Sequence, residues 1–124
     1  MSVPVFNFDL NFKYNKRIKM EDGMVIELVQ FKKKNQFTDK ELIEAGKAIN
    51  SVLSDFPGFI TREQARSGAN DWLDIVHWKN MECAVNASKE VMNIEICLSY
   101  FSMIEDETVQ LKHFDRTINS KEKL

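Results

Sequence analysis

The segments IELVQFK at residues 26–32 and LDIVHWK at residues 73–79 match in chemical class at every position. Each alternates its side chains with a period of two, which is typical of a β-strand, and each is followed by a segment with helical periodicity. Two such halves predict the order βαββαβ, with the first and third strands central and antiparallel and with both helices on one face. We therefore expect an α+β, ferredoxin-like antiparallel sheet.

The expected helices have clear boundary signals. Thr38 with Glu41 forms a capping box, and Asn80 is a favoured N-cap for the second helix. The pair Pro57-Gly58 ends the first helix, because proline lacks an N–H donor and glycine adopts positive φ readily. The sequence predicts strands at residues 24–32, 59–66, 72–79 and 108–114, and helices at about residues 38–56, 80–92 and 94–102.

The composition fits one folded domain, since 44% of the 124 residues are hydrophobic and 29% are charged. We expect this domain at residues 21–116. Apolar and polar residues alternate from Phe6 to Tyr14, so residues 1–20 are predicted to form an N-terminal arm or an edge strand, with a disordered tail as the alternative. Residues 117–124 are expected to form a flexible C-terminal tail.

Charge and cysteine content favour a cytoplasmic protein without nucleic-acid or membrane partners. The formal net charge is −2, so no overall field attracts a polyanion or an anionic membrane. The apolar stretch from Ile96 to Ile104 is about half of the ~20 residues that a membrane-spanning helix needs. Cys83 and Cys97 lack CxxC spacing, which suits a reducing compartment. The N-terminal segment does not have the pattern of a signal peptide.

The repeat also divides the central strands into two faces. One face is purely aliphatic and is expected to meet the helices: Ile26, Leu28, Leu73 and Ile75. The other is mixed, and its exposure on a monomer would be unusual: Glu27, Val29, Phe31, Trp72, Asp74, Val76 and Trp78. We expect an identical subunit to cover the mixed face, so that a homodimeric α+β barrel encloses a pocket between two sheets. A ligand, a water molecule, Arg62 or Arg66 would then partner the carboxylates.

Several of these features resemble the antibiotic biosynthesis monooxygenase superfamily of dimeric α+β barrels, over about residues 24–115. They are the element order, the entry Pro57-Gly58-Phe59 into the second strand, and the run WLDIVHWK at 72–79 followed by MECA at 81–84. That family includes cofactor-independent monooxygenases that oxidise polycyclic phenols, haem-degrading relatives, and proteins without a known activity.

The resemblance implies that Trp78 lines the pocket, as a third-strand tryptophan does in the quinone-forming members. Asp74 stands where those members carry an asparagine four residues earlier, so an anion replaces a neutral donor. His77 and His113 both fall on predicted strands, whereas the haem-degrading members use a helical histidine. A haem role is therefore disfavoured.

Two functions follow as hypotheses. The first is cofactor-independent oxidation of a small aromatic or enolisable substrate, with Asp74, Trp78 and His113 as catalytic candidates. In this hypothesis Trp78, Trp72 and Phe31 hold the ring, Asp74 or Glu27 accepts its proton, and His113 is a reserve base. The second is a non-catalytic small-molecule-binding or stress-response dimer of the same fold.

Each candidate also has a structural interpretation. The aromatic residues are typical of cores and interfaces. The carboxylates are of a kind that forms salt bridges at interfaces. His77 is expected on the helix side at the rim, as a minor substrate-binding candidate. We expect no cofactor and no metal, because the two histidines lack the close spacing of zinc motifs and the chain has neither a glycine-rich phosphate loop nor a GxSxG elbow.

Overall fold

The computed structural model describes residues 23–121. Its elements are β1 (Val25–Phe31), α1 (Asp39–Leu53), β2 (Phe59–Ser67), β3 (Asp71–Trp78), α2 (Met81–Glu90), α3 (Glu95–Phe101) and β4 (Gln110–Asp115), with short 3₁₀ turns at Val91–Asn93 and Asp106–Thr108. The predicted arm at residues 1–20 lies outside the described residues, and so do the last three residues of the predicted tail. Among residues 23–121, no helix combines the length and the apolar character that crossing a membrane requires.

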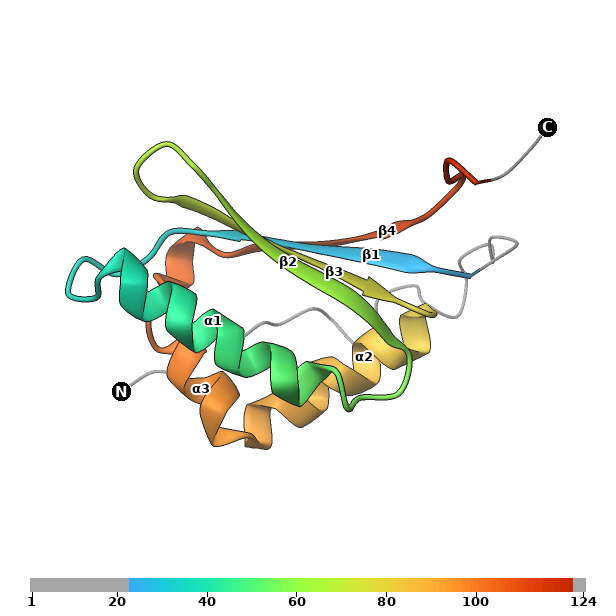
Figure 1. The fold of residues 1–124 in the computed structure, drawn as a ribbon, viewed down its shortest axis with the longest axis horizontal. Helices are drawn as coiled ribbons and strands as arrows, with labels where there is room; N and C mark the ends of the chain where they lie inside the picture. The colour runs from blue at the N-terminus through green and yellow to red at the C-terminus, as the bar shows by residue number, and fades with distance from the viewer. Residues whose placement is uncertain (1–22, 122–124) are drawn as a thin grey trace.

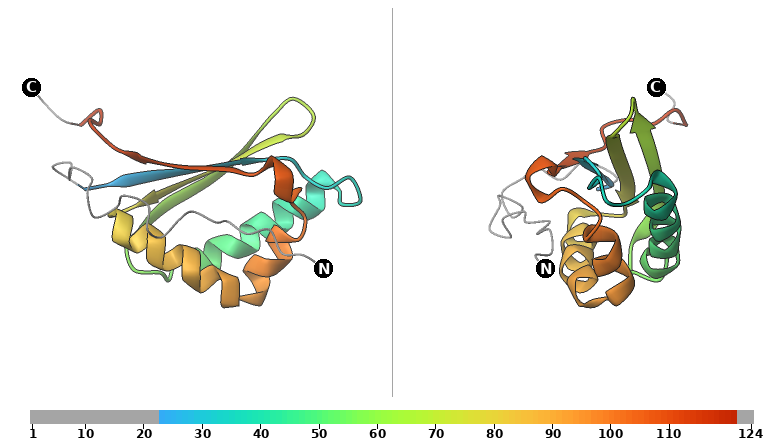
Figure 2. Two further views of the ribbon diagram at one scale, coloured as in Figure 1. Left: turned by 180° about the vertical axis from the view of Figure 1, so that it is seen from behind. Right: turned by 90° about the vertical axis from the view of Figure 1, so that its left-hand side faces the viewer.

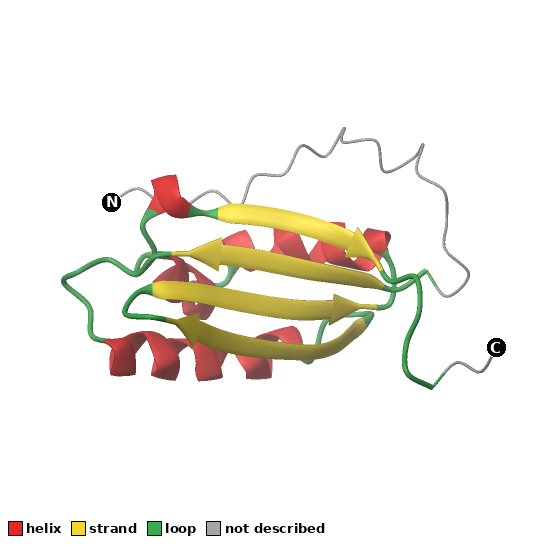
Figure 3. Ribbon diagram, turned by 90° about the horizontal axis from the view of Figure 1, so that it is seen from above, coloured by secondary structure: helices red, strands yellow, loops and turns green. Residues whose placement is uncertain are grey.

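The strands form one four-stranded antiparallel sheet in the order β2-β3-β1-β4. The first and third strands are therefore central, as the repeat predicts. The helices α1, α2 and α3 all lie on one side of this sheet (Figures 1 and 2). Viewed from the opposite side, the sheet carries no helix from the described part of the chain (Figure 3). The ferredoxin-like architecture is confirmed.

The predicted N-terminal signals of α1 and α2 act as expected, whereas α1 ends at Leu53, before the predicted end at residue 56. The Thr38 side chain accepts a hydrogen bond from the Glu41 backbone, and the Glu41 carboxylate accepts one from the Thr38 backbone. Asn80 accepts from the Cys83 backbone at the start of α2. Gly58 has a φ of +80° in the turn between α1 and β2, a conformation that favours glycine.

The prediction for the two sheet faces is wrong. Trp72, Asp74 and Trp78 are buried beneath the helices, whereas Leu73 and Ile75 are half-exposed on the open face. The large aromatic side chains bury more apolar area than the aliphatic ones, which favours placing them under the helices. Beneath the helices the carboxylates of the mixed face accept hydrogen bonds, which offset the free-energy cost of removing them from water. The pocket predicted between two subunits is therefore replaced by a cavity inside one subunit.

Candidate functional site

A cavity lies between the sheet and the helices that cover it. The space open to the centre of a water-sized sphere is about 80 Å³. Since one water molecule needs roughly 10–15 Å³ by this measure, several waters or a small ligand fit. All four strands and α1, α2 and α3 contribute to the walls. The apolar lining residues are Val29, Ile49, Leu53, Val76, Trp78, Ala87, Val91, Cys97, Phe101 and Leu111, and the polar ones are Glu27, Arg62, Asp74, Ser88 and Tyr100.

Strand register brings two carboxylates into this cavity. Glu27 on β1 lies opposite Val76 on β3, and Asp74 on β3 lies opposite Val29 on β1. Side chains alternate along a strand, so these four residues point to the same face and the carboxylates are diagonal neighbours. The predicted pair of carboxylates therefore shares one cavity, but each carboxylate has its own partners.

Asp74 belongs to a buried ion pair. Its Oδ1 accepts a hydrogen bond from Arg62 Nη2 at 2.9 Å, and its Oδ2 accepts one from the Tyr100 hydroxyl at 2.9 Å. Arg62 Nη1 also donates to the Gly46 carbonyl at 2.7 Å and to Asn50 Oδ1 at 2.8 Å, which fixes the guanidinium against α1. The side chains of Arg62 and Asp74 are 4% and 10% exposed. The charges are thus removed from water and compensated by each other.

Burial sets the protonation behaviour of this cluster. It raises the pKa of Asp74, while the Arg62 charge and the hydrogen bonds from Tyr100 and Arg62 act in the opposite direction. Burial also raises the pKa of Tyr100 well above its ordinary value, and the negative charge of Asp74 adds to this effect. Tyr100 therefore keeps its proton and donates to Asp74, while its oxygen accepts from Gln64 Nε2 at 2.9 Å. Burial likewise raises the pKa of the Cys97 thiol, so it stays protonated near neutral pH.

Glu27 belongs to a second cluster. The Trp78 indole Nε1 donates to Glu27 Oε1 at 3.2 Å, and His113 Nε2 lies 2.9 Å from Glu27 Oε2. His113 is directly opposite Glu27 in the pairing of β4 with β1. The Glu27 side chain is 13% exposed and that of His113 is 8% exposed. Glu27 and Trp78 line the cavity, whereas His113 contacts Glu27 without being one of the lining residues.

The structure brings Glu27, Asp74, Trp78 and His113 together and places the other predicted site residues elsewhere. Phe31 is buried behind the cavity wall, where its ring meets that of Tyr100 edge-on at 6.2 Å. His77 lies on the open face and bonds to Thr61 through Nδ1 at 3.1 Å. Its predicted position on the helix side is wrong. Asp74 and Trp78 face the helices, and side chains alternate along β3, so His77 faces the other way.

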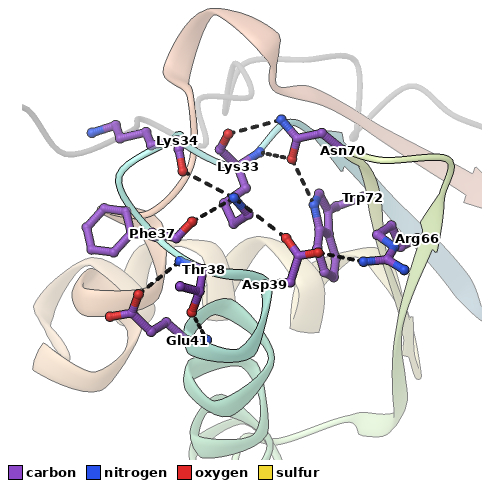
Figure 4. Close-up of polar contacts among 9 residues, drawn as sticks. All are labelled: Lys33, Lys34, Phe37, Thr38, Asp39, Glu41, Arg66, Asn70 and Trp72. Atoms are coloured by element: carbon purple, nitrogen blue, oxygen red, sulfur yellow. Dashed lines mark hydrogen bonds and ion pairs between the residues drawn. The ribbon is translucent and has the colours of Figure 1, made fainter.

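Trp72 lies in a separate polar cluster at the start of α1 (Figure 4). Its Nε1 donates to Asn70 Oδ1 at 3.0 Å, and Asn70 also bonds to the backbone of Lys33. The largely buried Lys33 Nζ donates to the Phe37 carbonyl at 2.7 Å and lies 3.6 Å from Asp39 Oδ1. These contacts fix the loop between β1 and α1, so Trp72 supports the fold rather than lining the cavity.

Sequence reasoning missed part of the site. It predicted the third helix at about residues 94–102 without assigning a role to Tyr100, and it included Arg62 merely as one of several partners for a carboxylate. Arg62 and Gln64 do alternate toward the helices on β2, and this period of two is a signal in the sequence. The helix residue that meets them was not identifiable, because the contact depends on how α3 lies on the sheet.

Among the residues described, 23–121, no group of three or more histidine, cysteine, aspartate or glutamate side chains is arranged to hold a metal ion. The chemistry that the cavity offers comes from its two carboxylates, the Arg62 charge and the Tyr100 hydroxyl.

Solved structures with this fold include enzymes of more than one kind. SnoaB, a cofactor-independent oxygenase from Streptomyces nogalater, matches with a TM-score of 0.68 at 14% identity, over 81% of this chain and 99% of that one. A candidate antibiotic biosynthesis monooxygenase from Bordetella bronchiseptica matches with a TM-score of 0.66 at 11% identity, over 77% and 99%. A hydroxynitrile lyase from Passiflora edulis matches with a TM-score of 0.61 at 12% identity, over 82% and 99%.

No family model and no curated protein matches the sequence. At these low identities the similarity to solved structures concerns the fold, and function has to be argued from the site. The chain has the α+β fold that the antibiotic biosynthesis monooxygenase-like proteins share, as the resemblance in its sequence implied.

Proposed function

We propose that the chain is a cofactor-independent oxygenase that acts on a small aromatic or enolisable molecule held in the cavity under the helices. The observation that carries this proposal is that Glu27, Asp74 and Trp78 line one largely apolar cavity. A flat substrate would lie against the Trp78 ring, and a carboxylate would remove its acidic proton. The proposal is consistent with the fold shared with SnoaB.

The reaction needs no oxidant beyond molecular oxygen. Loss of a proton leaves an electron-rich substrate anion, which reduces oxygen and combines with it. For an anthrone, one oxygen atom enters the ring carbon as a new carbonyl and the other leaves as water, so the four electrons given by the carbon match the four taken by oxygen. The protein would orient the ring, exclude bulk water and accept the proton.

Oxygen uptake with dithranol, a dihydroxyanthrone, tests this proposal. The native protein should accelerate both oxygen consumption and quinone formation over buffer, and Asp74→Asn and Glu27→Gln should reduce the acceleration. Asp71→Asn is the matched control, because Asp71 is an exposed carboxylate on the same strand that pairs with Lys32. If a panel of anthrones and hydroquinones gives the buffer rate, the oxygenase proposal is refuted. Quenching of tryptophan fluorescence by any of them would then favour the non-catalytic binding role of the same fold.

We also propose that the protein is a homodimer whose subunits pair through the open face of the sheet. This face presents Ile26, Leu28, Leu73 and Ile75 half-exposed and Phe114 39% exposed. An aliphatic sheet face of this kind is normally covered, and a second copy can present the same surface across a two-fold axis. We place the dimer in the cytoplasm, where the free thiols of Cys83 and Cys97 would persist.

Light scattering with size-exclusion chromatography tests the dimer. The native protein should elute with twice the monomer mass at micromolar concentration, and Ile75→Lys, in the centre of the open face, should yield a monomer. Ile43→Lys is the matched control, since Ile43 is 36% exposed on α1, away from this face. A native protein with the monomer mass would refute the proposal.

A further inference from the structure

Glu27 and Asp74 share the cavity, but their surroundings suit them to different tasks. We propose that Glu27 is the group that accepts the substrate proton, that His113 is the positioning residue for its carboxylate, and that Asp74 serves to balance Arg62. This inference rests on the proposed function and assigns roles within the same site.

Asp74 is poorly placed to take up a proton during a reaction. Both of its oxygens already accept hydrogen bonds, from Arg62 and from Tyr100, at 2.9 Å each. Arg62 is permanently charged and its side chain is 4% exposed. Protonation of Asp74 would leave this buried guanidinium without its counter-ion. An uncompensated buried charge typically destabilises the folded protein strongly.

Glu27 can take up a proton without stranding a permanent charge. Its Oε1 accepts from the neutral indole of Trp78 at 3.2 Å. Its Oε2 lies 2.9 Å from His113 Nε2, and the imidazole is a donor in this contact because the carboxylate has no proton to give. Neither partner has to be a cation. Oε1 also bonds to a ring that forms the cavity wall, which places it where a substrate hydroxyl or acidic C–H can approach.

The proposed step is a simple proton transfer. The O–H or acidic C–H bond of the substrate breaks, its electron pair stays on the substrate, and the proton bonds to a Glu27 carboxylate oxygen. Glu27 changes from an anion to a neutral acid while the substrate becomes an anion, so the net charge in the cavity is unchanged and nothing is oxidised or reduced. The hydrogen bond from His113 holds the carboxylate at the cavity wall before and after the transfer.

Hydrogen exchange without oxygen isolates this step. Dithranol is incubated with the protein in deuterated buffer under anaerobic conditions, and deuterium uptake at its acidic ring carbon is followed by NMR. The native protein should accelerate uptake over buffer, and Glu27→Gln should lower the acceleration about 100-fold or more, as expected for loss of a general base. The double variant Arg62→Met with Asp74→Asn removes both charges of the ion pair. Its loss of exchange acceleration should be at least tenfold smaller than that of Glu27→Gln. The double variant replaces Asp74→Asn in this comparison if the single variant fails to fold.

His113 variants test the positioning role. His113→Gln retains an N–H donor at the corresponding distance along the side chain, so it should keep exchange within about tenfold of native, whereas His113→Ala should approach the loss of Glu27→Gln. His77→Ala, on the opposite face, should leave exchange unchanged. Equal rates for His113→Gln and His113→Ala would overturn the positioning role.

The two proposals fail in different ways. Exchange by Glu27→Gln within threefold of native, or native oxygen uptake without catalysed exchange, would overturn the assignment of Glu27 while leaving the oxygenase proposal in place. A native protein that neither consumes oxygen nor accelerates exchange would overturn the proposed function, and the role of Glu27 with it.

Discussion

Arg62→Met is expected to destabilise the fold strongly, because it removes one partner of a buried ion pair. The Arg62 side chain is 4% exposed, and its guanidinium donates to Asp74, to Asn50 and to the Gly46 carbonyl. Methionine replaces the apolar stem of the side chain but none of these donors. Asp74 would lose the hydrogen bond from Arg62 and keep the one from Tyr100.

The magnitude follows from that geometry. Removing one partner of a buried ion pair typically costs about 3–5 kcal/mol, while replacing both partners is often close to neutral. Asp74 lessens the loss by taking up a proton, because its pKa is already raised by burial and would rise further without Arg62. A raised pKa gives stability at low pH that is lost as the pH rises through the folded-state value. The deficit of Arg62→Met should therefore be smaller at pH 5 than at pH 7.

Urea unfolding followed by the fluorescence of Trp72 and Trp78 measures the effect. The double variant Arg62→Met with Asp74→Asn should recover to within about 1.5 kcal/mol of native. Lys47→Met is the exposed control, since the Lys47 and Glu44 side chains of that pair are 68% and 60% exposed, and it should change stability by less than about 0.5 kcal/mol. A loss below about 1 kcal/mol for Arg62→Met, or a double variant no more stable than the single one, would refute the reasoning.

Three further predictions concern the fold. Gly58→Ala should cost about 2 kcal/mol of stability or more, because φ is +80° and the new Cβ would lie 2.6 Å from Cys83 Cβ. Gly68→Ala should cost about 1 kcal/mol, because φ is +62° but no neighbour lies within 4 Å. Equal losses of stability in urea unfolding would contradict the packing argument. Above pH 10, the native protein should lose up to ~1.4 kcal/mol per pH unit more than Tyr100→Phe, because a raised pKa gives stability that is lost at high pH; parallel pH profiles of stability would contradict it. Thr38→Ala should cost about 1 kcal/mol through loss of the N-cap, and an unchanged urea midpoint would show that the capping box contributes little.

Much of the fold could be predicted from the chain alone, because the deciding signals are local. The two matching segments around Glu27 and Asp74 gave the central strands, and the capping residues Thr38 and Asn80 gave the helix starts. Gly58 marked the turn that leads into β2. Each of these depends on backbone conformation and on hydrogen bonds within a few residues, so no knowledge of the packed molecule is needed.

The choice between the two sheet faces was not local, and there the sequence-based prediction failed. Alternation separates Asp74 from Ile75, but it does not say which of the two meets the helices. The answer depends on whether a buried carboxylate finds a donor. Arg62 from β2 and Tyr100 from α3 supply donors to Asp74, and neither is close to it in sequence.

The sequence by itself therefore determined the order of the elements, the central position of the two repeated strands and the membership of each sheet face. The tertiary structure decided which face is covered, and with it that Glu27, Asp74 and Trp78 line a cavity within one subunit. The physical reason is the range of the forces involved. Periodicity and capping act over a few residues, whereas compensation of a buried charge requires side chains that only the assembled helices and strands bring together.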